Sequence, residues 1–285
     1  MHPDFLVDLR FDPYFPQHHE LAIVRYFFEP GRRLFRWPHR PLPVAKSLLL
    51  LFTNRCGSNW LAELLYATGL TGWTEEFFND AYVFEACALG GITSFDAYIH
   101  FLPHVPLQSR PFFTTKLSWD QLWFLTRCGV IPGIISTPVF VNVVRRDRAA
   151  QALSLHLALR TGQWKSYWNS GINAECDPFL VSDQDLLATM EALSISQMNF
   201  DRYFLEHGTA PHVVVYEDLQ QDPLGCLDRL LVATGLAESG RWKIDKSQIR
   251  LQRQMTPRSM ERLAEFRRRF PDADAFERSH RPAAE

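Results

Sequence analysis

Short apolar runs alternate with amphipathic segments along most of this chain. The first run, SLLLLFT at residues 47–53, is continuously apolar and has the length of a strand, which is typical of a parallel sheet covered on both faces. Ser58 and the segment WLAELLYAT follow, and the apolar residues of that segment recur on one face of a helix that ends near Gly69. Further strands are predicted at residues 112–117, 139–145 and 212–217.

Amphipathic segments between and after these strands predict helices at residues 119–128, 148–161, 184–207 and 222–235. Because strands and helices alternate, we predict an α/β fold of three layers, in which helices flank a parallel sheet. Residues 46–285 are expected to form a single domain. Residues 1–45 are rich in Pro, His and aromatic residues without a steady period, which predicts an irregular N-terminal extension. Residues 162–182 also lack a clear period and are expected to form an insertion on the substrate side.

Composition limits the classes of partner. The chain has 285 residues, 46% of them hydrophobic, so it can bury a sizeable core. Its formal net charge of −2 provides no global field for nucleic acid or an anionic membrane, so any anion site must be local. The five cysteines are scattered without a C-x-x-C pair, which argues against a disulfide framework or a zinc site. No apolar run approaches the roughly 18 residues of a membrane span, and the N-terminus MHPDFLVDLR is acidic, so we expect a cytoplasmic protein.

The turn after the first strand is a candidate anion site. A strand-to-helix turn points backbone N–H groups at a helix N-terminus, where negative charge is favoured. Here Gly57 permits close approach, Ser58 and Asn59 add donors, and Arg55 adds a positive charge, although the lysine of a nucleotide triphosphatase loop is missing. Alternatively, this is a plain turn with Ser58 as N-cap. Cys56 lies beside the arginine at the helix N-terminus, and both features lower a thiol pKa, so we expect it to be the most reactive cysteine.

A second candidate anion site lies in VVRRDRAAQALSL, residues 143–155. The strand delivers Arg145 and Arg146 to its carboxyl end, the edge at which open α/β sheets bind ligands, and Ser154 follows on the next helix. One of these arginines, together with the serine, could clamp a second phosphate. Alternatively, both arginines pair with Asp147 or with solvent at the start of the helix.

The stretch GWTEEFF, residues 72–78, offers a candidate base. Phe77 and Phe78 are expected to be buried and to hold a neighbouring carboxylate in a dry, rigid setting. In an extended segment Glu75 and Glu76 point to opposite sides, so only one of them can face a substrate. The alternative is a pair of solvated glutamates.

Lys116 stands near the end of the predicted strand in TTKLSWDQL, residues 114–122. It could contact a bound anion, or it could be a surface lysine whose stem covers apolar surface while its ammonium reaches water. The sequence pattern does not separate these two interpretations.

Together these motifs resemble the sulfotransferases that use 3′-phosphoadenosine 5′-phosphosulfate (PAPS), and within that family the bacterial trehalose 2-sulfotransferase type. The resemblance extends from Lys46 to Arg269. TNRCGSNWL resembles the loop that holds the phosphosulfate, and EEFF resembles the family's Q-E-F-F motif. TTKLSWDQ resembles the family's G-K-L-M-W-N-Q strand. RRDRAAQALSL resembles its R-x-D-x-x-x-Q-A-V-S stretch. YEDLQQDP, residues 216–223, resembles a turn of these folds, and residues 251–263 resemble a stretch near the cofactor.

The resemblance implies a P-loop-like sulfotransferase fold and transfer of a sulfuryl group from PAPS, without a metal, to a hydroxyl of a small carbohydrate or glycolipid. It implies Glu76 as the general base and Arg55 as a second catalytic residue. The residues implied to bind PAPS are Arg55, Cys56, Gly57, Ser58, Asn59, Trp60, Arg145 and Ser154. In this chain Cys56 stands where a serine is usual, and Asn59 where a threonine is usual.

Two alternatives are a non-catalytic PAPS- or anion-binding relative and a P-loop small-molecule kinase. The kinase would need a loop lysine and an acid for magnesium, which VNVVRRD does not supply. No nucleic-acid partner is expected, and a homodimer is left open.

Overall fold

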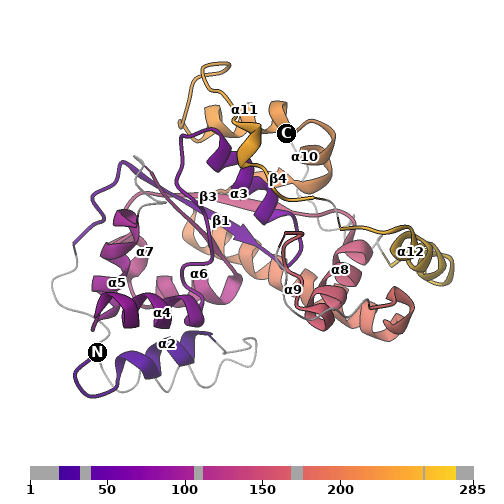
Figure 1. The fold of residues 1–285 in the computed structure, drawn as a ribbon, viewed down its shortest axis with the longest axis horizontal. Coiled ribbons are helices and arrows are strands. Elements are labelled where there is room, and N and C mark those ends of the chain that lie inside the picture. The colour runs from indigo at the N-terminus through magenta and orange to yellow at the C-terminus, as the bar shows by residue number, and fades with distance from the viewer. Residues whose placement is uncertain (1–18, 33–39, 106–111, 168–175, 253, 274–285) are drawn as a thin grey trace. The chain divides into compact units, whose positions relative to one another are not determined.

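The computed structural model describes residues 19–32, 40–105, 112–167, 176–252 and 254–273. Within these ranges four strands form one sheet in the order β2-β1-β3-β4 (Figure 1). The strands are β1 (Lys46–Phe52), β2 (Phe112–Leu117), β3 (Pro138–Val144) and β4 (His212–Val215). β1 pairs with β2 in parallel, and Leu50 lies opposite Lys116. The predicted α/β fold, a parallel sheet flanked by helices, is therefore confirmed.

The helices in the described ranges include several that the sequence pattern predicts and several that it does not. The predicted ones are α3 (Ser58–Ala67), α6 (Trp119–Arg127), α8 (Arg148–Thr161), α9 (Asp183–His207) and α11 (Pro223–Ala233). The others are α2 (His19–Phe27), α4 (Asp80–Gly90), α5 (Phe95–Phe101), α7 (Val130–Gly133), α10 (Tyr216–Gln221) and α12 (Pro257–Arg269), with short 3-10 helices η1 (Leu102–His104), η3 (Pro178–Leu180) and η4 (Lys246–Gln248). Two predictions change: the segment around α2 is not irregular, and β4 ends before Tyr216 because that residue begins a helix.

The chain forms two compact units. Unit 1 comprises residues 1–51 and 68–141, and unit 2 comprises residues 52–67 and 142–285. The prediction that residues 46–285 form a single domain stays a prediction. Of the predicted substrate-side insertion, residues 168–175 lie outside the described ranges, as do residues 1–18 and 33–39 of the N-terminal extension.

Unit 1 has an aromatic core. The ring of Phe95 stacks on Tyr98 with 6.1 Å between centroids and contacts Phe124 at 5.7 Å. Phe78 packs edge-on against the same Phe95 ring, and Phe77 stacks on Phe113 of β2. The two phenylalanines that follow the glutamates of EEFF are thus buried, as predicted, and they anchor that segment in the core.

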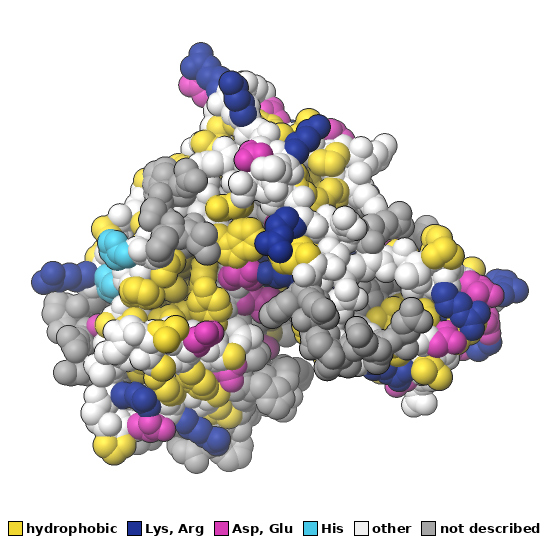
Figure 2. Space-filling model, in the orientation of Figure 1, with side chains coloured by type: hydrophobic (Ala, Val, Ile, Leu, Met, Phe, Trp, Pro, Cys, Tyr) yellow, Lys and Arg dark blue, Asp and Glu magenta, His cyan; other side chains and the backbone are white. Residues whose placement is uncertain are grey.

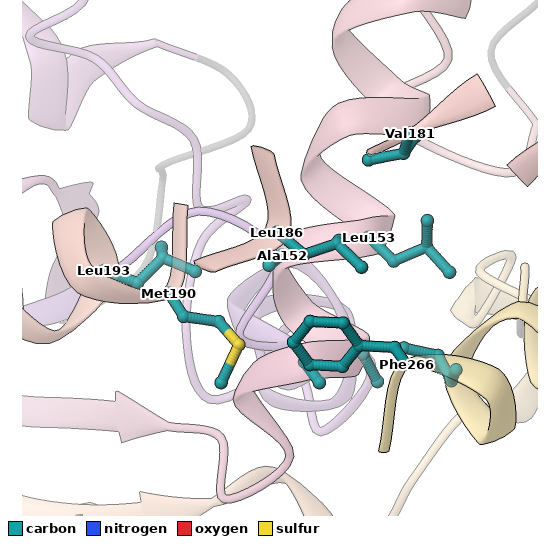
Figure 3. Close-up of a cluster of buried hydrophobic side chains, with 10 residues drawn as sticks. Ala152, Leu153, Val181, Leu186, Met190, Leu193 and Phe266 are labelled. Atoms are coloured by element: carbon teal, nitrogen blue, oxygen red, sulfur yellow. The ribbon is translucent and has the colours of Figure 1, made fainter. Parts of the chain in front are cut away.

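The core of unit 2 lies between α8, α9 and α12. Figure 3 shows side chains from these elements converging on one cluster. The cluster consists of Ala149, Ala150, Ala152, Leu153, Val181, Leu186, Met190, Leu193, Leu263 and Phe266. Alanines on α8 leave room for the larger side chains opposite, so the helix that carries Ser154 is fixed by close packing.

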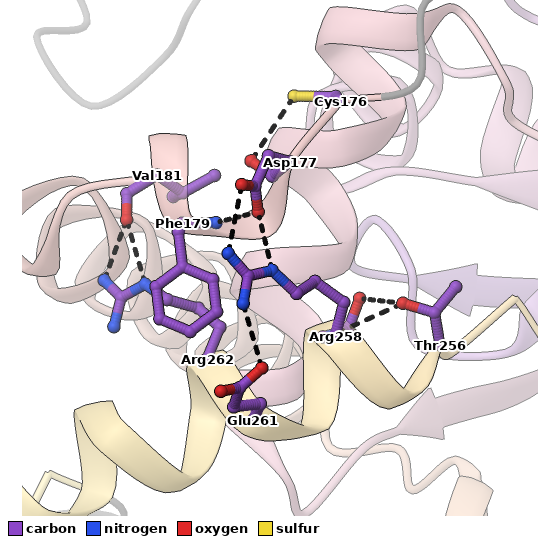
Figure 4. Close-up of polar contacts among 9 residues, drawn as sticks. Cys176, Asp177, Phe179, Val181, Thr256, Arg258, Glu261 and Arg262 are labelled. Carbon is purple, nitrogen blue, oxygen red and sulfur yellow. Dashed lines mark hydrogen bonds and ion pairs between the residues drawn. The ribbon is translucent and has the colours of Figure 1, made fainter.

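Polar contacts attach α12 to η3, the short helix before α9 (Figure 4). Arg258 donates from two nitrogens to the Asp177 carboxylate, each at 3.2 Å. The buried Arg262 donates to the carbonyl oxygen of Val181 at 2.8 and 3.1 Å. Thr256 caps the first turn by accepting from the backbone N–H of Ser259. The start of α12 is therefore fixed, and so is the segment that leads into it.

The surface carries no single basic patch on the face drawn in Figure 2, where Lys and Arg side chains are scattered among acidic and uncharged ones. That distribution agrees with the net charge of −2 and requires any anion site to be local. Among the described residues, no helix combines the length and the apolar character that crossing a membrane would require.

Candidate active site

The loop between β1 and α3 has an unusual backbone at Arg55. Its φ of +65° lies in the left-handed region, and among the described residues it is the only positive φ outside glycine. Such a conformation costs about 1–3 kcal/mol and concentrates at functional sites. The turn is closed by a hydrogen bond from the Cys56 N–H to the Thr53 carbonyl, 3.2 Å. The strained residue is thus the one predicted to contact an anion.

Gly57 is required in this loop for two reasons. Its φ of +97° is one that side-chain-bearing residues rarely adopt. A Cβ at this position would also lie 2.4 Å from Cδ2 of Tyr216, closer than atoms can approach. The loop backbone therefore packs directly against the Tyr216 ring.

We expect Gly57→Ala to destabilise unit 2 by about 1–3 kcal/mol and to weaken nucleotide binding, because the loop must shift to clear the tyrosine. Gly69→Ala is the matched control: its φ is +71°, but a Cβ there meets nothing within 4 Å. Chemical denaturation of both variants measures the difference. Equal losses in the two would show that the tyrosine contact is unimportant.

The side chain of Gln151 on α8 fixes the loop through hydrogen bonds. Its side chain is fully buried, and Nε2 donates to Thr53 Oγ1 at 2.9 Å and to the Asn54 carbonyl at 2.7 Å. Its Oε1 accepts from Arg148 Nη1 at 2.9 Å. The sequence pattern alone predicts no role for Gln151, although a glutamine on the apolar side of a helix must find buried partners.

The side chain of Arg55 is fixed by three neutral acceptors. Nε donates to Ser154 Oγ at 2.9 Å, Nη1 donates to the Trp164 carbonyl at 2.6 Å, and Nη2 donates to Gln254 Oε1. Burial lowers the pKa of Arg55, and the nearby Arg145 guanidinium lowers it further. These acceptors orient the guanidinium without neutralising its charge.

Arg145 lies beside it and is held without a carboxylate among its described contacts. Its guanidinium stands 4.7 Å from the centroid of the Tyr216 ring, and Nη1 donates to the backbone carbonyl of Arg55 at 3.2 Å. Nε is buried, and no described residue accepts a hydrogen bond from it. We call Arg55, Arg145, Ser154 and Gln254 the arginine cluster. Two adjacent positive charges and an unused buried donor are features of an anion site.

Arg146 has a different role from its neighbour. It forms a two-pronged ion pair with Asp218 of α10, at 2.6 and 2.7 Å, and is 44% exposed. The Glu217 carboxylate accepts the backbone N–H groups of Arg146 and Asp147, at 3.0 and 3.1 Å. Arg146 is thus paired with an acid, but its partner is Asp218 and not the predicted Asp147, which pairs with Arg267 instead, whereas Arg145 points into the arginine cluster.

The prediction that Cys56 is reactive is wrong. The residue is fully buried, and burial raises the pKa of its thiol, although hydrogen bonds with Ser58 act in the opposite direction. The helix N-terminus favours a thiolate only where the charge remains solvated or paired, and this thiol points into the protein interior.

Cys56 is accordingly expected to resist limited iodoacetamide treatment at neutral pH, while the partly exposed Cys176 and Cys226 are modified first. Peptide mapping of the alkylated protein measures the order of modification. Preferential labelling of Cys56 would show that the loop opens far more readily than its burial indicates.

The remaining loop residues begin α3. Ser58 is buried, and Asn59 and Trp60 are half-buried, with the Trp60 ring edge-on to Tyr216 at 6.3 Å. Their predicted contacts with a bound nucleotide stay predictions. Their positions on the first turn of the helix agree with a set of donors at its N-terminus.

In unit 1, β2 aligns the segment that carries the candidate base. The backbone N–H of Lys116 donates to the Glu75 carbonyl at 2.9 Å, and Thr115 Oγ1 donates to the same carbonyl at 3.1 Å. The Thr74 hydroxyl donates to Thr114 Oγ1 at 2.8 Å. Residues 72–76 are thus tied to the strand along their length without being a strand themselves.

Lys116 is buried between two carboxylates. Its Nζ lies 3.5 Å from Glu76 Oε1 and 3.6 Å from Glu75 Oε2, and its side chain is 2% exposed. Trp73 Nε1 donates to Glu75 Oε1 at 3.0 Å. We call Trp73, Glu75, Glu76 and Lys116 the glutamate cluster. The interpretation of Lys116 as a surface lysine is wrong, because its side chain is buried; a contact with a bound anion stays a prediction.

Two expectations about the glutamates are wrong. Their side chains do not diverge, since both reach the same ammonium; the irregular segment lacks the alternation of a pleated strand. The setting is also not dry, because the Glu76 side chain is 36% exposed. The carboxylate stands at the surface of unit 1 with a buried cation behind it.

Comparison with known protein families identifies the family of this chain. The family model described as Stf0 sulphotransferase matches residues 47–269 of the chain. Comparison with curated proteins gives no match. Among the residues that the structure describes, no group of three or more His, Cys, Asp and Glu side chains could hold a metal ion.

Proposed function

Since this chain belongs to the Stf0 sulphotransferase family and is thus a sulfotransferase, we propose that it transfers the sulfuryl group of PAPS to a hydroxyl of a small carbohydrate or glycolipid. The observation that carries the choice of donor is the arginine cluster, in which two adjacent guanidinium groups have only neutral oxygen partners among their described contacts. An anion with more than one phosphate-like group is the complement of such a site.

Within this proposal Arg145 and Ser154 bind the 3′-phosphate. The unused Nε of Arg145 supplies one donor. Ser154 Oγ already accepts from Arg55, so its own hydrogen remains to be donated to a phosphate oxygen. Arg55 and the loop residues Gly57 to Trp60 contact the phosphosulfate at the N-terminus of α3, where the helix dipole favours negative charge.

Glu76 acts as the general base in this proposal. It takes the proton of the acceptor hydroxyl as the acceptor oxygen bonds to sulfur and the bond between sulfur and the bridging phosphate oxygen breaks, which releases adenosine 3′,5′-bisphosphate. Charge on the leaving phosphate is stabilised by Arg55, whose fixed orientation requires no rearrangement during the step. The proton and the electron pair are both accounted for without a metal.

The acceptor is proposed as a carbohydrate from the aromatic residues near the glutamates. Phe77 and Phe78 are buried in the core and cannot stack on a sugar, whereas Tyr82 is 39% exposed and Trp73 is half-buried. Residues 164–168 are a second aromatic-rich stretch, in which Trp164 and Tyr167 are half-buried and Trp168 lies outside the described ranges. Cytoplasmic location and a homodimer also stay predictions.

Thermal shift with three nucleotides tests the choice of donor. Adenosine 3′,5′-bisphosphate is expected to raise the melting temperature more than AMP, and ATP with magnesium is expected to have little effect. Transfer of radiolabelled sulfate from PAPS to trehalose, and then to other sugars, tests the acceptor class. A stronger shift with ATP and magnesium would favour the kinase alternative, and binding of PAPS without turnover of any hydroxyl compound would favour a non-catalytic relative.

A further inference from the structure

The glutamate cluster places one buried ammonium between two neighbouring carboxylates. We propose that Lys116 is a positioning residue for sulfuryl transfer: its ammonium orients the Glu76 carboxylate and at the same time contacts the Glu75 carboxylate. This inference rests on the proposed role of Glu76 as the base. It adds a residue of β2, Lys116, to the machinery of the reaction.

The position of the ammonium is set by rigid structure. Lys116 lies in β2 opposite Leu50 of β1, and its backbone N–H is bound to the Glu75 carbonyl. The strand therefore fixes both the lysine and the backbone of the glutamate segment. A long, flexible side chain that is 2% exposed has little freedom to move its charge elsewhere.

The two carboxylates differ in how they are held. Glu75 accepts from Trp73 Nε1 as well as from Lys116, and its side chain is 20% exposed. Glu76 contacts the ammonium only through Oε1, at 3.5 Å, and among the described residues no hydrogen bond or ion pair reaches its Oε2. Oε2 is therefore the oxygen available to take the proton of an acceptor hydroxyl.

Charge explains why the lysine matters. Two carboxylates side by side repel, so one of them tends to bind a proton unless a cation offsets the repulsion. A further titratable group of unit 1, Tyr82 on α4, interacts with this cluster: burial raises the pKa of its phenol, and the negative charge of Glu75 raises it further. Around neutral pH this tyrosine is uncharged, so the charge that faces both carboxylates is that of Lys116.

The test is the pH profile of kcat for Lys116→Met, measured as transfer from PAPS to trehalose, or as PAPS hydrolysis if trehalose is not sulfated. The acidic limb is expected to move to higher pH, because the substitution removes the cation that contacts both carboxylates. Thermal shift with adenosine 3′,5′-bisphosphate is expected to match the wild type, because the nucleotide contacts belong to the arginine cluster.

Glu75→Gln is expected to shift the acidic limb in the opposite direction. It is the second test of the proposal if Lys116→Met does not fold. The amide keeps an acceptor for the Trp73 indole but removes the like charge, so the acidic limb is expected to move to lower pH. If the cluster had only a structural role, the two substitutions would change kcat or stability without moving the acidic limb of the pH profile. If the acidic limb of the kcat profile does not move in the variants that fold, and Glu76→Gln is inactive, the role of Lys116 is overturned. The proposed function would then remain intact. Full activity of Glu76→Gln would instead overturn the proposed base.

Discussion

Glu76→Gln is expected to bind adenosine 3′,5′-bisphosphate like the wild type and to lose about 10² to 10⁴ in kcat, the range that general-base catalysis contributes. The amide keeps the size of the side chain and an oxygen that can still accept from Lys116, but it cannot take a proton. The nucleotide contacts are assigned to the arginine cluster and the loop, so the substitution should leave bisphosphate binding unchanged. Rapid-quench transfer from PAPS and calorimetry with the bisphosphate separate the two effects.

The matched control is Glu75→Gln. This side chain is the less exposed of the two, and it is tied to the Trp73 indole, so its loss is expected to change the pH dependence more than the maximal rate. If Glu75→Gln were inactive and Glu76→Gln active, Glu75 and not Glu76 would be the general base. The lysine would then position Glu75, and the register of the EEFF motif would be shifted by one residue.

Arg145→Ala is expected to weaken binding of adenosine 3′,5′-bisphosphate by about 1.5–3 kcal/mol, the contribution of a charge-assisted hydrogen bond, or about 10- to 150-fold in Kd. The variant should no longer prefer the bisphosphate over AMP, because the lost donor is the one assigned to the 3′-phosphate. Ser154→Ala should act in the same direction by a smaller factor, since its hydroxyl also fixes Arg55. Isothermal titration calorimetry with both nucleotides measures the discrimination.

Arg146→Ala is a close control for that experiment. It has the same charge and the adjacent position in the chain, but it is paired with Asp218 at the surface. Its loss should leave the preference for the bisphosphate unchanged. If Arg146→Ala abolished the preference while Arg145→Ala retained it, the phosphate assignment would be wrong.

The arginine cluster also shows how a site can hold charge ready for a ligand. Arg55 donates to a hydroxyl, a carbonyl and an amide oxygen, each a dipole rather than a charge. A carboxylate in any of these places would bind the guanidinium more strongly and would compete with an incoming phosphate. The neutral partners keep Arg55 oriented while its charge remains available.

The sequence by itself determined the fold class and the order of the main elements. The continuous apolar run of β1, the exact span of β2 at residues 112–117 and that of α8 at residues 148–161 were predictable, because buried parallel strands and capped helices have local signatures. The motifs also placed the candidate loop, base and phosphate residues, and the resemblance they carry is confirmed at the level of the family.

Only the tertiary structure decided which charged side chain faces which. Arg145 and Arg146 are adjacent and chemically identical, and contacts with the Tyr216 ring and with Asp218, about 70 residues further along the chain, separate their roles. Burial of Cys56 and the shared contact of Glu75 and Glu76 with Lys116 likewise depend on packing between segments distant in the sequence. Local patterns predict backbone geometry, whereas the solvation and pairing of a charge are set by the residues that folding brings around it.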